Sequence, residues 1–337
     1  MLSPTIFLNK KGGRVRKILP VFLLLTTPYC TKVFSASDST KNSQKSEKNS
    51  PKQSTLMLGH RGASFDAPEN THASIKKAFD LGADGVEIDV QLTHDKKIIV
   101  LHDDILKRTA TYTKNLQNTG ISKQTFEYLV NTPVHLLEYN QLNKIDIGLW
   151  KKSPSGTVWK KELVPTLNQV LPIILNPKTP TKKSLRKIQI EIKTDNLAII
   201  STLKNTLSQY PKTQISQSIF LISFDLEVIK TAKREIPYCT CLLVREHKQI
   251  PTRQDIETII STIIKSGLDG IALEADPALV TQELVNKIHQ KNKIIGVWVY
   301  PHQDTLKNLH YFKKTRVNFF TTNLPSAIAN TIKQAPE

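Results

Sequence analysis

Residues 85–92 of this 337-residue chain read Gly-Val-Glu-Ile-Asp-Val-Gln-Leu, and a second apolar run, Ile-Ile-Val-Leu-His, follows at 98–102. β-Branched residues and short length make both runs typical of strands. Only residues 93–97 separate them, whereas a crossover between parallel strands needs about a dozen residues or more. The second run is therefore expected to fold back on the first as the arm of a hairpin.

Apolar runs of the same kind recur along the rest of the chain, with amphipathic segments between most of them. Besides 85–92, the predicted strands are 55–59, 188–193, 219–224, 239–245, 269–273, 294–300 and 317–321. The predicted helices are 71–81, 165–175, 195–209, 225–235, 252–266, 277–291, 304–313 and 324–333. This alternation favours an α/β fold with a parallel sheet covered by helices. Eight strands, with the hairpin arm set aside, match a (β/α)₈ TIM-type barrel. A doubly wound open sheet is the alternative.

The N-terminal segment differs in composition from the predicted barrel. Residues 1–36 combine a basic start with the apolar stretch 18–25 and then small residues, which is typical of a signal peptide. The stretch is too short to span a bilayer, which takes about 20 apolar residues. We therefore expect an exported protein, periplasmic or secreted. A lipoprotein anchored through Cys30 is the less favoured alternative, because Thr-Pro-Tyr before it is a poor acylation context.

Two further boundaries follow from composition. Residues 37–54 are polar, without aromatic or large apolar side chains, and are expected to be a disordered linker. A single barrel domain is then expected over 55–337. Within it, residues 103–164 are polar with scattered apolar positions, so we interpret them as a small inserted cap region. Because this insertion leaves the barrel at the end of the hairpin arm, it is expected to cover the face where barrel active sites lie.

The chain is strongly basic, with 47 lysines and arginines against 29 acidic residues, a net charge of +18. Residues 1–36 carry six of the basic residues and no acid, so the remainder has a net charge of +12. A solubilising surface is the default interpretation, and attraction to an anionic substrate or a transient membrane-surface contact is the alternative. Nucleic acid is not expected as a partner, because the basic residues are scattered and no nucleic-acid motif is present.

Acidic residues occupy matching positions in two of the predicted strands. Glu87 and Asp89 lie two apart and so face the same side of their strand, and Glu191 and Lys193 repeat that spacing on the next barrel strand. Three carboxylates facing a barrel interior form an oxygen-rich site that suits Mg²⁺ or Ca²⁺. The same residues could instead form an internal salt-bridge network neutralised by Lys193 and Arg61. The spacing alone leaves both interpretations open.

Two histidines at the ends of strands shift the balance toward a catalytic site. His60 follows the first run and His102 ends the hairpin arm, so both flank the carboxylates. Histidine can take up and release a proton near neutral pH, as cleavage of a phosphate ester requires. Arg61 and Lys193 supply cations suited to a phosphoryl group. The set is typical of phosphoryl-transfer chemistry.

The order of these motifs resembles the glycerophosphodiester phosphodiesterase family over about residues 55–330. The matching segments are His-Arg-Gly at 60–62, Ala-Pro-Glu-Asn-Thr at 67–71, Glu-Ile-Asp-Val-Gln-Leu-Thr at 87–93, His-Asp at 102–103, Glu-Ile-Lys at 191–193, Val-Pro-Thr-Leu at 164–167, Ser-Phe at 223–224 and Val-Trp-Val at 297–299. Several separated motifs in one order make the resemblance specific, whereas His-Arg-Gly alone is a weak signal. The resemblance implies a TIM-type barrel with an insertion after the His-Asp motif.

The resemblance also implies roles for individual residues. It implies that Glu87, Asp89 and Glu191 are ligands of a divalent cation, Ca²⁺ or Mg²⁺. His60 and His102 match the general acid/base pair of the family.

Further positions match groups that bind the substrate. Arg61 and Lys193 match cations that contact the phosphate, and Glu69 matches a further acid beside the metal site, either a ligand or a group behind the ligands. Phe224 and Trp298 match aromatic residues of the pocket. For both, packing within the barrel is the competing interpretation.

One departure concerns the last strand, which in the family commonly ends Thr-Asp-x-Pro. This chain has Thr322-Asn323-Leu324-Pro325 instead. The carboxylate is lost, so a change in local hydrogen bonding is expected, without loss of the cation. Asn323 could also cap the final helix.

The implied reaction is hydrolysis of a small-molecule glycerophosphodiester to glycerol 3-phosphate and an alcohol. A phospholipase-type activity on intact lipids is one alternative, but 103–164 has no long apolar stretch for insertion into a membrane. A non-catalytic phosphate-binding barrel is the other, and the full set of expected catalytic residues argues against it.

Overall fold

The computed structural model describes residues 54–152, 156–176, 185–249 and 252–325. These residues belong to one compact unit, residues 51–337. The predicted signal peptide, nearly all of the predicted linker and most of the predicted helix 324–333 lie outside the described residues. The proposed domain boundaries therefore stay predictions.

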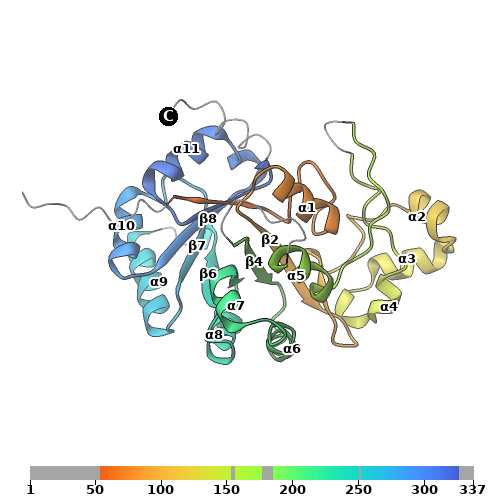
Figure 1. Cartoon of the computed structure of the whole chain (residues 1–337), viewed down its shortest axis with the longest axis horizontal. Coiled ribbons are helices and arrows are strands. Elements are labelled where there is room, and N and C mark those ends of the chain that lie inside the picture. The colour runs from red at the N-terminus through yellow and green to blue at the C-terminus, as the bar shows by residue number, and fades with distance from the viewer. Residues whose placement is uncertain (1–53, 153–155, 177–184, 250–251, 326–337) are drawn as a thin grey trace, which may run out of the picture. The chain divides into compact units, whose positions relative to one another are not determined.

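Eight parallel strands form a closed barrel (Figure 1). They are β1 (Leu56–Gly59), β2 (Gly85–Leu92), β4 (Lys187–Ile192), β5 (Ile219–Ser223), β6 (Thr240–Arg245), β7 (Gly270–Glu274), β8 (Ile294–Trp298) and β9 (Phe319–Thr322). Pairing between β1 and β2 closes the ring, which confirms the barrel and excludes the open sheet. This joint is short: two residue pairs are in register between β1 and β2, against six between β2 and β4.

The hairpin arm predicted after the second strand is also confirmed. β3 (Ile98–Val100) pairs antiparallel with β2 and stands outside the ring of parallel strands. It is shorter than the predicted run, because the chain leaves the strand before His102. The arm thus delivers His102 to the edge of β2.

Helices follow the barrel strands and cover the outer face of the barrel. They are α1 (His72–Asp80), α5 (Leu167–Leu175), α6 (Ala198–Leu207), α7 (Lys212–Ser218), α8 (Leu226–Glu235), α9 (Arg253–Lys265), α10 (Gln282–Gln290) and α11 (Leu306–Thr315). Side chains at the first positions fix several starts: Thr71, Asp225 and Thr281 each accept a hydrogen bond from a backbone N–H of the helix that follows. The sequence prediction missed α7, a seven-residue helix before β5.

Two apolar layers hold the barrel together. The larger lies between strands and helices, and a smaller one fills the interior with Leu58, Ile222, Leu242, Val244, Ala272 and Phe319. Gly296 on β8 makes room for the interior ring of Phe319, since a Cβ at Gly296 would lie 1.9 Å from that ring. The interior is therefore packed at one end, and the polar side chains of β2 and β4 fill the other.

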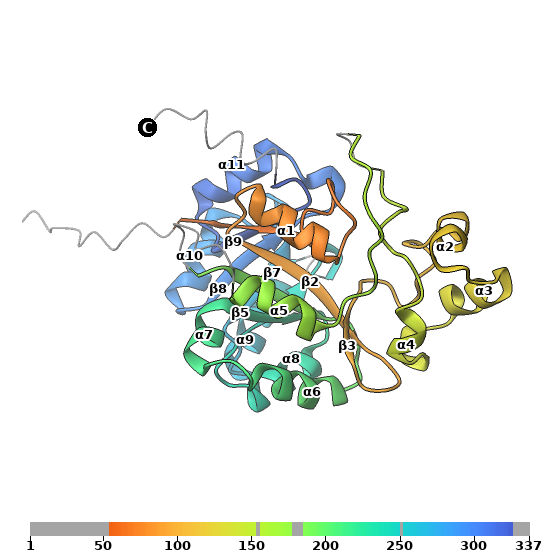
Figure 2. The same cartoon turned by 45° about the vertical axis from the view of Figure 1, so that its right-hand side comes forward.

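The insertion after β3 has more structure than its sequence indicated. It forms α2 (Tyr112–Thr119), α3 (Lys123–Asn131) and the single turn α4 (Tyr139–Leu142) around an apolar cluster of its own. Phe126, Leu129 and Val130 are buried at helical spacing on α3, a signal that the sequence analysis did not weigh. Figure 2 shows α2, α3 and α4 beside the barrel. The role of the insertion as a cap stays a prediction.

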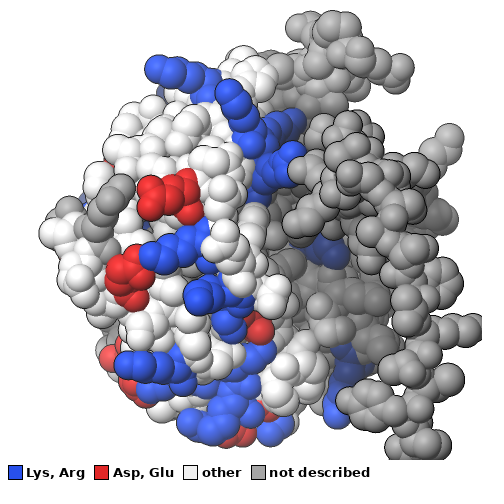
Figure 3. All heavy atoms as spheres, turned by 90° about the vertical axis from the view of Figure 1, so that its left-hand side faces the viewer, with Lys and Arg blue, Asp and Glu red and all other residues white. Residues whose placement is uncertain are grey.

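Figure 3 shows the distribution of charged side chains on one face of the molecule. On the face drawn in Figure 3, lysine and arginine side chains are scattered and acidic side chains lie among them. Within the described ranges no helix is both long and apolar enough to cross a membrane.

Candidate active site

Three carboxylates converge inside the barrel because β2 and β4 are neighbours in register. Asp89 pairs directly with Glu191, and Glu87 lies two residues before Asp89 on the same inward face. One carboxylate oxygen from each of the three lies within 4.8 Å of the others. Glu87 and Asp89 are almost completely buried. The predicted ligands are thus brought together.

Three buried acids this close repel one another, and the repulsion raises the pKa values of Glu87 and Glu191. Burial, together with the charges of Asp89 and Glu191, raises the pKa of Glu87 well above its usual range. Burial and the charge of Asp89 raise the pKa of Glu191, although the ammonium of Lys193 opposes the effect. The cluster therefore lacks positive charge at its centre.

The salt-bridge interpretation accounts for only part of this cluster. Lys193 Nζ lies 3.0 Å from Glu191 Oε1, and Arg61 Nε lies 3.4 Å from Asp89 Oδ2. Glu87 Oε1 and Asp89 Oδ1, however, are buried and accept no hydrogen bond among the described residues. The ammonium of Lys193 lies 4.0 Å from Asp89 Oδ1, which is beyond hydrogen-bond distance. Carboxylate oxygens without hydrogen bonds beside a third carboxylate fit a hard divalent cation.

The loop after β1 brings His60 and Arg61 to this centre through a tight turn. Arg61 and Gly62 both have positive φ angles, 53° and 80°. Gly62 is required there, because a Cβ would lie 2.5 Å from Ser74 Oγ on α1. The turn is held by a hydrogen bond that the backbone N–H of Arg61 donates to Glu87 Oε2 at 2.9 Å. The first loop is therefore fastened directly to a predicted cation ligand.

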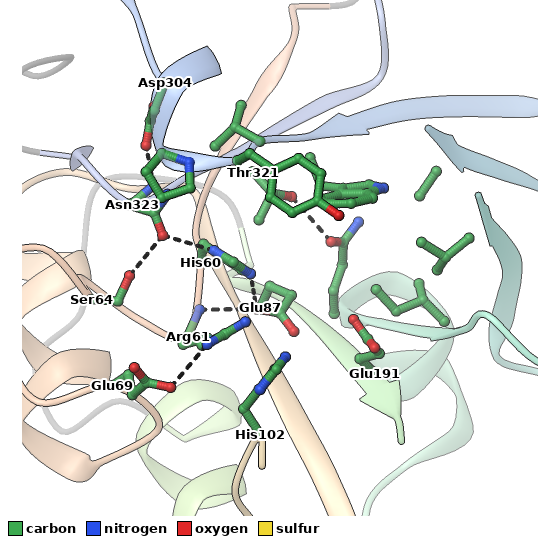
Figure 4. A pocket seen from close by; sticks show the side chains of 18 of the residues that line it. His60, Arg61, Ser64, Glu69, Glu87, His102, Glu191, Asp304, Thr321 and Asn323 are labelled. Carbon is green, nitrogen blue, oxygen red and sulfur yellow. Dashed lines mark hydrogen bonds and ion pairs between the residues drawn. The ribbon is translucent and has the colours of Figure 1, made fainter. Parts of the chain in front are cut away.

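His60 lies between the cluster and the end of β9 (Figure 4). Its Nδ1 donates to Asn323 Oδ1 at 2.8 Å, and its Nε2 lies 3.8 Å from Glu87 Oε2. Asn323 also accepts from Ser64 Oγ, while its backbone N–H donates to Asp304 Oδ2 at 2.6 Å. With Nδ1 donating, the unprotonated Nε2 faces the cluster. Burial, aided by the charge of Arg61, lowers the pKa of His60 to about 4.

His102 approaches from the opposite side of the cluster (Figure 4). Its Nδ1 is paired with Asp103 Oδ1 at 2.6 Å, and its Nε2 lies 3.3 Å from Lys193 Nζ. A carboxylate on Nδ1 fixes the orientation of the ring. The two predicted histidines therefore face one space, each oriented through Nδ1 by a different side chain.

Glu69 occupies a different place from the cation ligands. Its carboxylate receives Arg61 Nη1 at 3.0 Å and two hydrogen bonds from Arg108, each at 2.7 Å. Burial alone would raise the pKa of Glu69, but the hydrogen bonds of Arg108 and the charges of both arginines lower it to about 2. Glu69 thus stands behind Arg61. Arg108 also binds Asp103, with Nε 2.6 Å from Oδ2, and so connects the insertion with the partner of His102.

A cavity of about 690 Å³ opens onto most of these groups. His60, Arg61, Glu87, His102, Glu191 and Lys193 line it, and so do the aromatic residues Phe224 and Trp298. The rings of Phe224 and Trp298 pack edge to face, with centroids 5.8 Å apart. The competing prediction of barrel packing also has support, because both rings contact the interior apolar cluster.

Several residues of the site were not predicted from the sequence. Arg108 and Lys151 reach the barrel from the insertion, and Lys151 Nζ donates to the Ser64 carbonyl oxygen at 2.6 Å. Asp304 holds the end of β9 from the loop after β8. The one sequence signal was at Asn323, where the family pattern changes, and its Oδ1 accepts from His60 and Ser64.

Comparisons with known proteins agree with this geometry. Residues 60–326 match the model of the Glycerophosphoryl diester phosphodiesterase family. A glycerophosphodiester phosphodiesterase of Caldanaerobacter subterraneus subsp. tengcongensis is 28% identical over 184 residues, which cover 55% of this chain and 64% of the relative. The match thus spans just under two thirds of that relative's length.

Two solved structures share the fold. A putative glycerophosphoryl diester phosphodiesterase from Silicibacter pomeroyi superposes with a TM-score of 0.66 at 18% identity, covering 85% of this chain and 96% of that one. An Oleispira antarctica phosphodiesterase, solved in complex with the product sn-glycerol-3-phosphate, gives a TM-score of 0.62 at 20% identity and covers 83% and 98%. Because the family model matches most of the sequence, from His60 through the end of β9, this chain belongs to the glycerophosphoryl diester phosphodiesterase family.

Proposed function

We propose that this protein hydrolyses glycerophosphodiesters to glycerol 3-phosphate and an alcohol, with a divalent cation and two histidines. The observation that carries the proposal is one cavity lined by a buried carboxylate cluster, two imidazoles and two cationic side chains. Family membership and the names of the relatives support the substrate class. The structure bound to glycerol 3-phosphate belongs to another member of this fold.

Glu87, Asp89 and Glu191 would hold the cation, Ca²⁺ or Mg²⁺. A cation there supplies positive charge against a phosphate oxygen and makes phosphorus more electrophilic. Arg61 and Lys193 lie on either side of the cluster, within 3.4 Å of Asp89 and 3.0 Å of Glu191 respectively. Their role is to bind the remaining phosphate oxygens and the charge that develops on them.

The two histidines divide the proton transfers. His60 is neutral near pH 7, because burial lowers its pKa to about 4, and its Nε2 is free to accept the proton of the attacking hydroxyl. That hydroxyl belongs to water, or to the glycerol 2-position of the substrate. In the second case a cyclic phosphate forms as the alcohol leaves, and water then opens it to glycerol 3-phosphate. His102, backed by Asp103, gives a proton to the leaving alcohol through Nε2. Asn323 keeps the ring of His60 in the tautomer that its role needs. Asp103 orients the ring of His102, which donates through Nε2 when both of its ring nitrogens carry a proton.

Turnover with and without chelator tests the proposal. The protein is treated with EDTA and assayed on several glycerophosphodiesters by coupled detection of glycerol 3-phosphate, and then Ca²⁺ or Mg²⁺ is restored. We expect activity to disappear with EDTA and return with one of the cations. His60→Ala and His102→Ala are each expected to lower kcat by about 100-fold or more. Activity indifferent to EDTA would contradict the cation, and unchanged turnover in both variants would contradict the histidine roles.

We further propose that the protein is exported, on the basis of the basic and apolar composition of residues 1–36. Fusion of residues 1–54 to a reporter that is active only outside the cytoplasm tests this. Reporter activity should depend on the apolar stretch 18–25. Equal activity after that stretch is replaced by polar residues would argue against export.

A further inference from the structure

Arg108, near the start of the insertion, uses both edges of its planar guanidinium group to hold two carboxylates. Nη1 and Nη2 each donate to one oxygen of Glu69 at 2.7 Å. Nε and Nη2 donate to the two oxygens of Asp103, at 2.6 and 3.1 Å. Two bidentate contacts on one rigid plane fix the directions of both carboxylates as well as their separation. A lysine ammonium is a point charge and has no such geometry.

Each of these carboxylates also contacts a group that the proposed reaction uses. Glu69 Oε1 accepts a hydrogen bond from Arg61 Nη1 at 3.0 Å (Figure 4). Asp103 Oδ1 is paired with His102 Nδ1 at 2.6 Å. Arg108 is therefore the centre of a chain of contacts that runs from a cation proposed to bind the phosphate to the histidine proposed to protonate the leaving alcohol.

Arg108 itself lies outside the cavity. Arg61, Glu69 and His102 line the cavity, whereas the described lining includes neither Arg108 nor Asp103. The guanidinium group is therefore not placed to touch a substrate bound there. Any effect of Arg108 on the reaction must pass through the two carboxylates that it holds.

The backbone that carries Arg108 is fixed by packing. Leu106 and Thr109, which lie on either side of Arg108 in the chain, are both buried. The backbone N–H of Thr109 donates to the Leu106 carbonyl oxygen at 3.0 Å, and Leu106 belongs to the apolar cluster of the insertion. The side chain of Arg108 is half-exposed, but it extends from a turn that is anchored in this cluster. Such support is what keeps reacting groups in a productive arrangement.

We infer that Arg108 is a positioning residue, which holds Arg61 and His102 at the separation that the reaction requires. The inference rests on the proposed function and adds to it a role for the insertion. His102 must direct Nε2 at the oxygen of the leaving alcohol, so its proton transfer depends on the direction of the ring. A displacement of about 1 Å in the active site can lower a rate about 100-fold.

Two substrates that differ in their need for a proton test this role. The ethyl ester of glycerol 3-phosphate must release a basic alkoxide unless the alcohol is protonated, whereas the p-nitrophenyl ester releases a stable phenolate. In Arg108→Met we expect kcat to fall about 100-fold on the ethyl ester and about tenfold or less on the nitrophenyl ester. A general disturbance of the fold would lower both rates alike. Arg108→Lys should recover only part of the loss on the ethyl ester.

Further variants separate the two contacts of Arg108. Asp103→Asn should slow the ethyl ester more than the nitrophenyl ester, as Arg108→Met does, because it acts through His102. Glu69→Gln should slow both esters alike, because it acts through Arg61. In the double variant of Glu69 and Asp103, Arg108→Met should have little further effect. Arg234→Met is the matched control, since Arg234 forms an exposed ion pair with Glu235 on α8, and it should leave both rates unchanged.

The possible results separate the inference from the function beneath it. No loss in Arg108→Met, or equal losses on the two esters, would overturn the inference and leave the proposed function standing. If Arg108→Met does not fold, Asp103→Asn takes its place, and equal rates on the two esters relative to the wild type would again overturn the inference. Failure of the wild type to hydrolyse either ester with the cation supplied, or equal losses on both esters in His102→Ala, would refute the proposed function instead.

Discussion

Replacement of Glu87 by Gln should change the stability of the protein in opposite directions with and without the cation. In the wild type, a cation at 100 times its Kd stabilises the fold by about 2.7 kcal/mol, which corresponds to about 5–10 °C in Tm for a domain of this size. If the loss of one of three carboxylates weakens binding about 100-fold, the same concentration contributes only about 0.4 kcal/mol, about 1 °C. The Tm shift on adding Ca²⁺ or Mg²⁺ should therefore nearly vanish in Glu87→Gln.

Without the cation the same substitution relieves repulsion. The folded-state pKa of Glu87 is raised by burial and by its two acidic neighbours, so the carboxyl favours folding most when it is protonated. Stability of the cation-free wild type is then highest below the unfolded pKa of this group, and it falls as the pH rises through the folded pKa. At pH 7, Glu87→Gln in EDTA should melt at the wild-type temperature or above it.

Scanning calorimetry at matched protein concentration, with EDTA and then with each cation, measures both effects. Glu127→Gln is the control, since Glu127 is an exposed carboxylate on α3 away from the barrel. That variant should follow the wild type in every condition. A Glu87→Gln protein that gains the full wild-type shift with the cation would refute the carboxylate site, and one that melts well below the wild type in EDTA would refute the claim of repulsion.

Three further variants test other contacts of the site and barrel. Arg108→Met removes the hydrogen bonds that keep the pKa of Glu69 at about 2 against the effect of burial. Because Arg108 is half-exposed, we expect the free energy of unfolding to fall by only about 1–2 kcal/mol at pH 7. In urea unfolding, this difference from the wild type should shrink as the pH falls from about 5 toward 2, because Glu69 becomes protonated over this range. A difference that does not change with pH would contradict the ion pair of Arg108 with Glu69 as its cause. Asn323→Asp places a carboxylate beside His60 and should raise the pKa of His60 from about 4. The acidic limb of the pH profile of kcat/KM should then move to higher pH. An acidic limb that does not move would argue against His60 as the base. Gly296→Ala forces a methyl group against the ring of Phe319 and should lower the free energy of unfolding by about 1–3 kcal/mol, as measured in urea. An unchanged free energy of unfolding would mean that the ring can shift.

The barrel could be predicted from the sequence because its signals are local. A strand such as 85–92 carries its own pattern of burial, and the short gap before 98–102 excludes a crossover by length alone. The cluster was predictable for the same reason, since the register of β2 and β4 follows from where the two strands begin. The residues behind the cluster follow no such rule. Asn323 contacts His60 across 263 positions, and Arg108 contacts Glu69 across 39. Neither pairing can be deduced without the closed ring.

The insertion shows a second limit. Its helices are short, and α4 buries only Leu142 while the described side chains of α2 bury only Asn115, so their apolar residues are too few to stand out in a polar segment. They become ordered because Ile99, Leu101 and Val164 from the hairpin arm and its return contribute to the same cluster. Burial that depends on partners from elsewhere in the chain leaves only a weak local pattern.

The short joint between β1 and β2 has a consequence for how the enzyme would lose activity. His60 and Arg61 follow β1, and Glu87 belongs to β2, so the proposed catalytic groups lie on the two barrel strands that share the fewest paired residues. A phosphate and a cation bound between these groups would connect β1 to β2 and so strengthen the weakest contact between neighbouring strands of the barrel. Heat or denaturant that separates β1 from β2 would therefore abolish activity by local unfolding, before the rest of the barrel unfolds. Bound product would shift this loss of activity to a higher temperature or denaturant concentration.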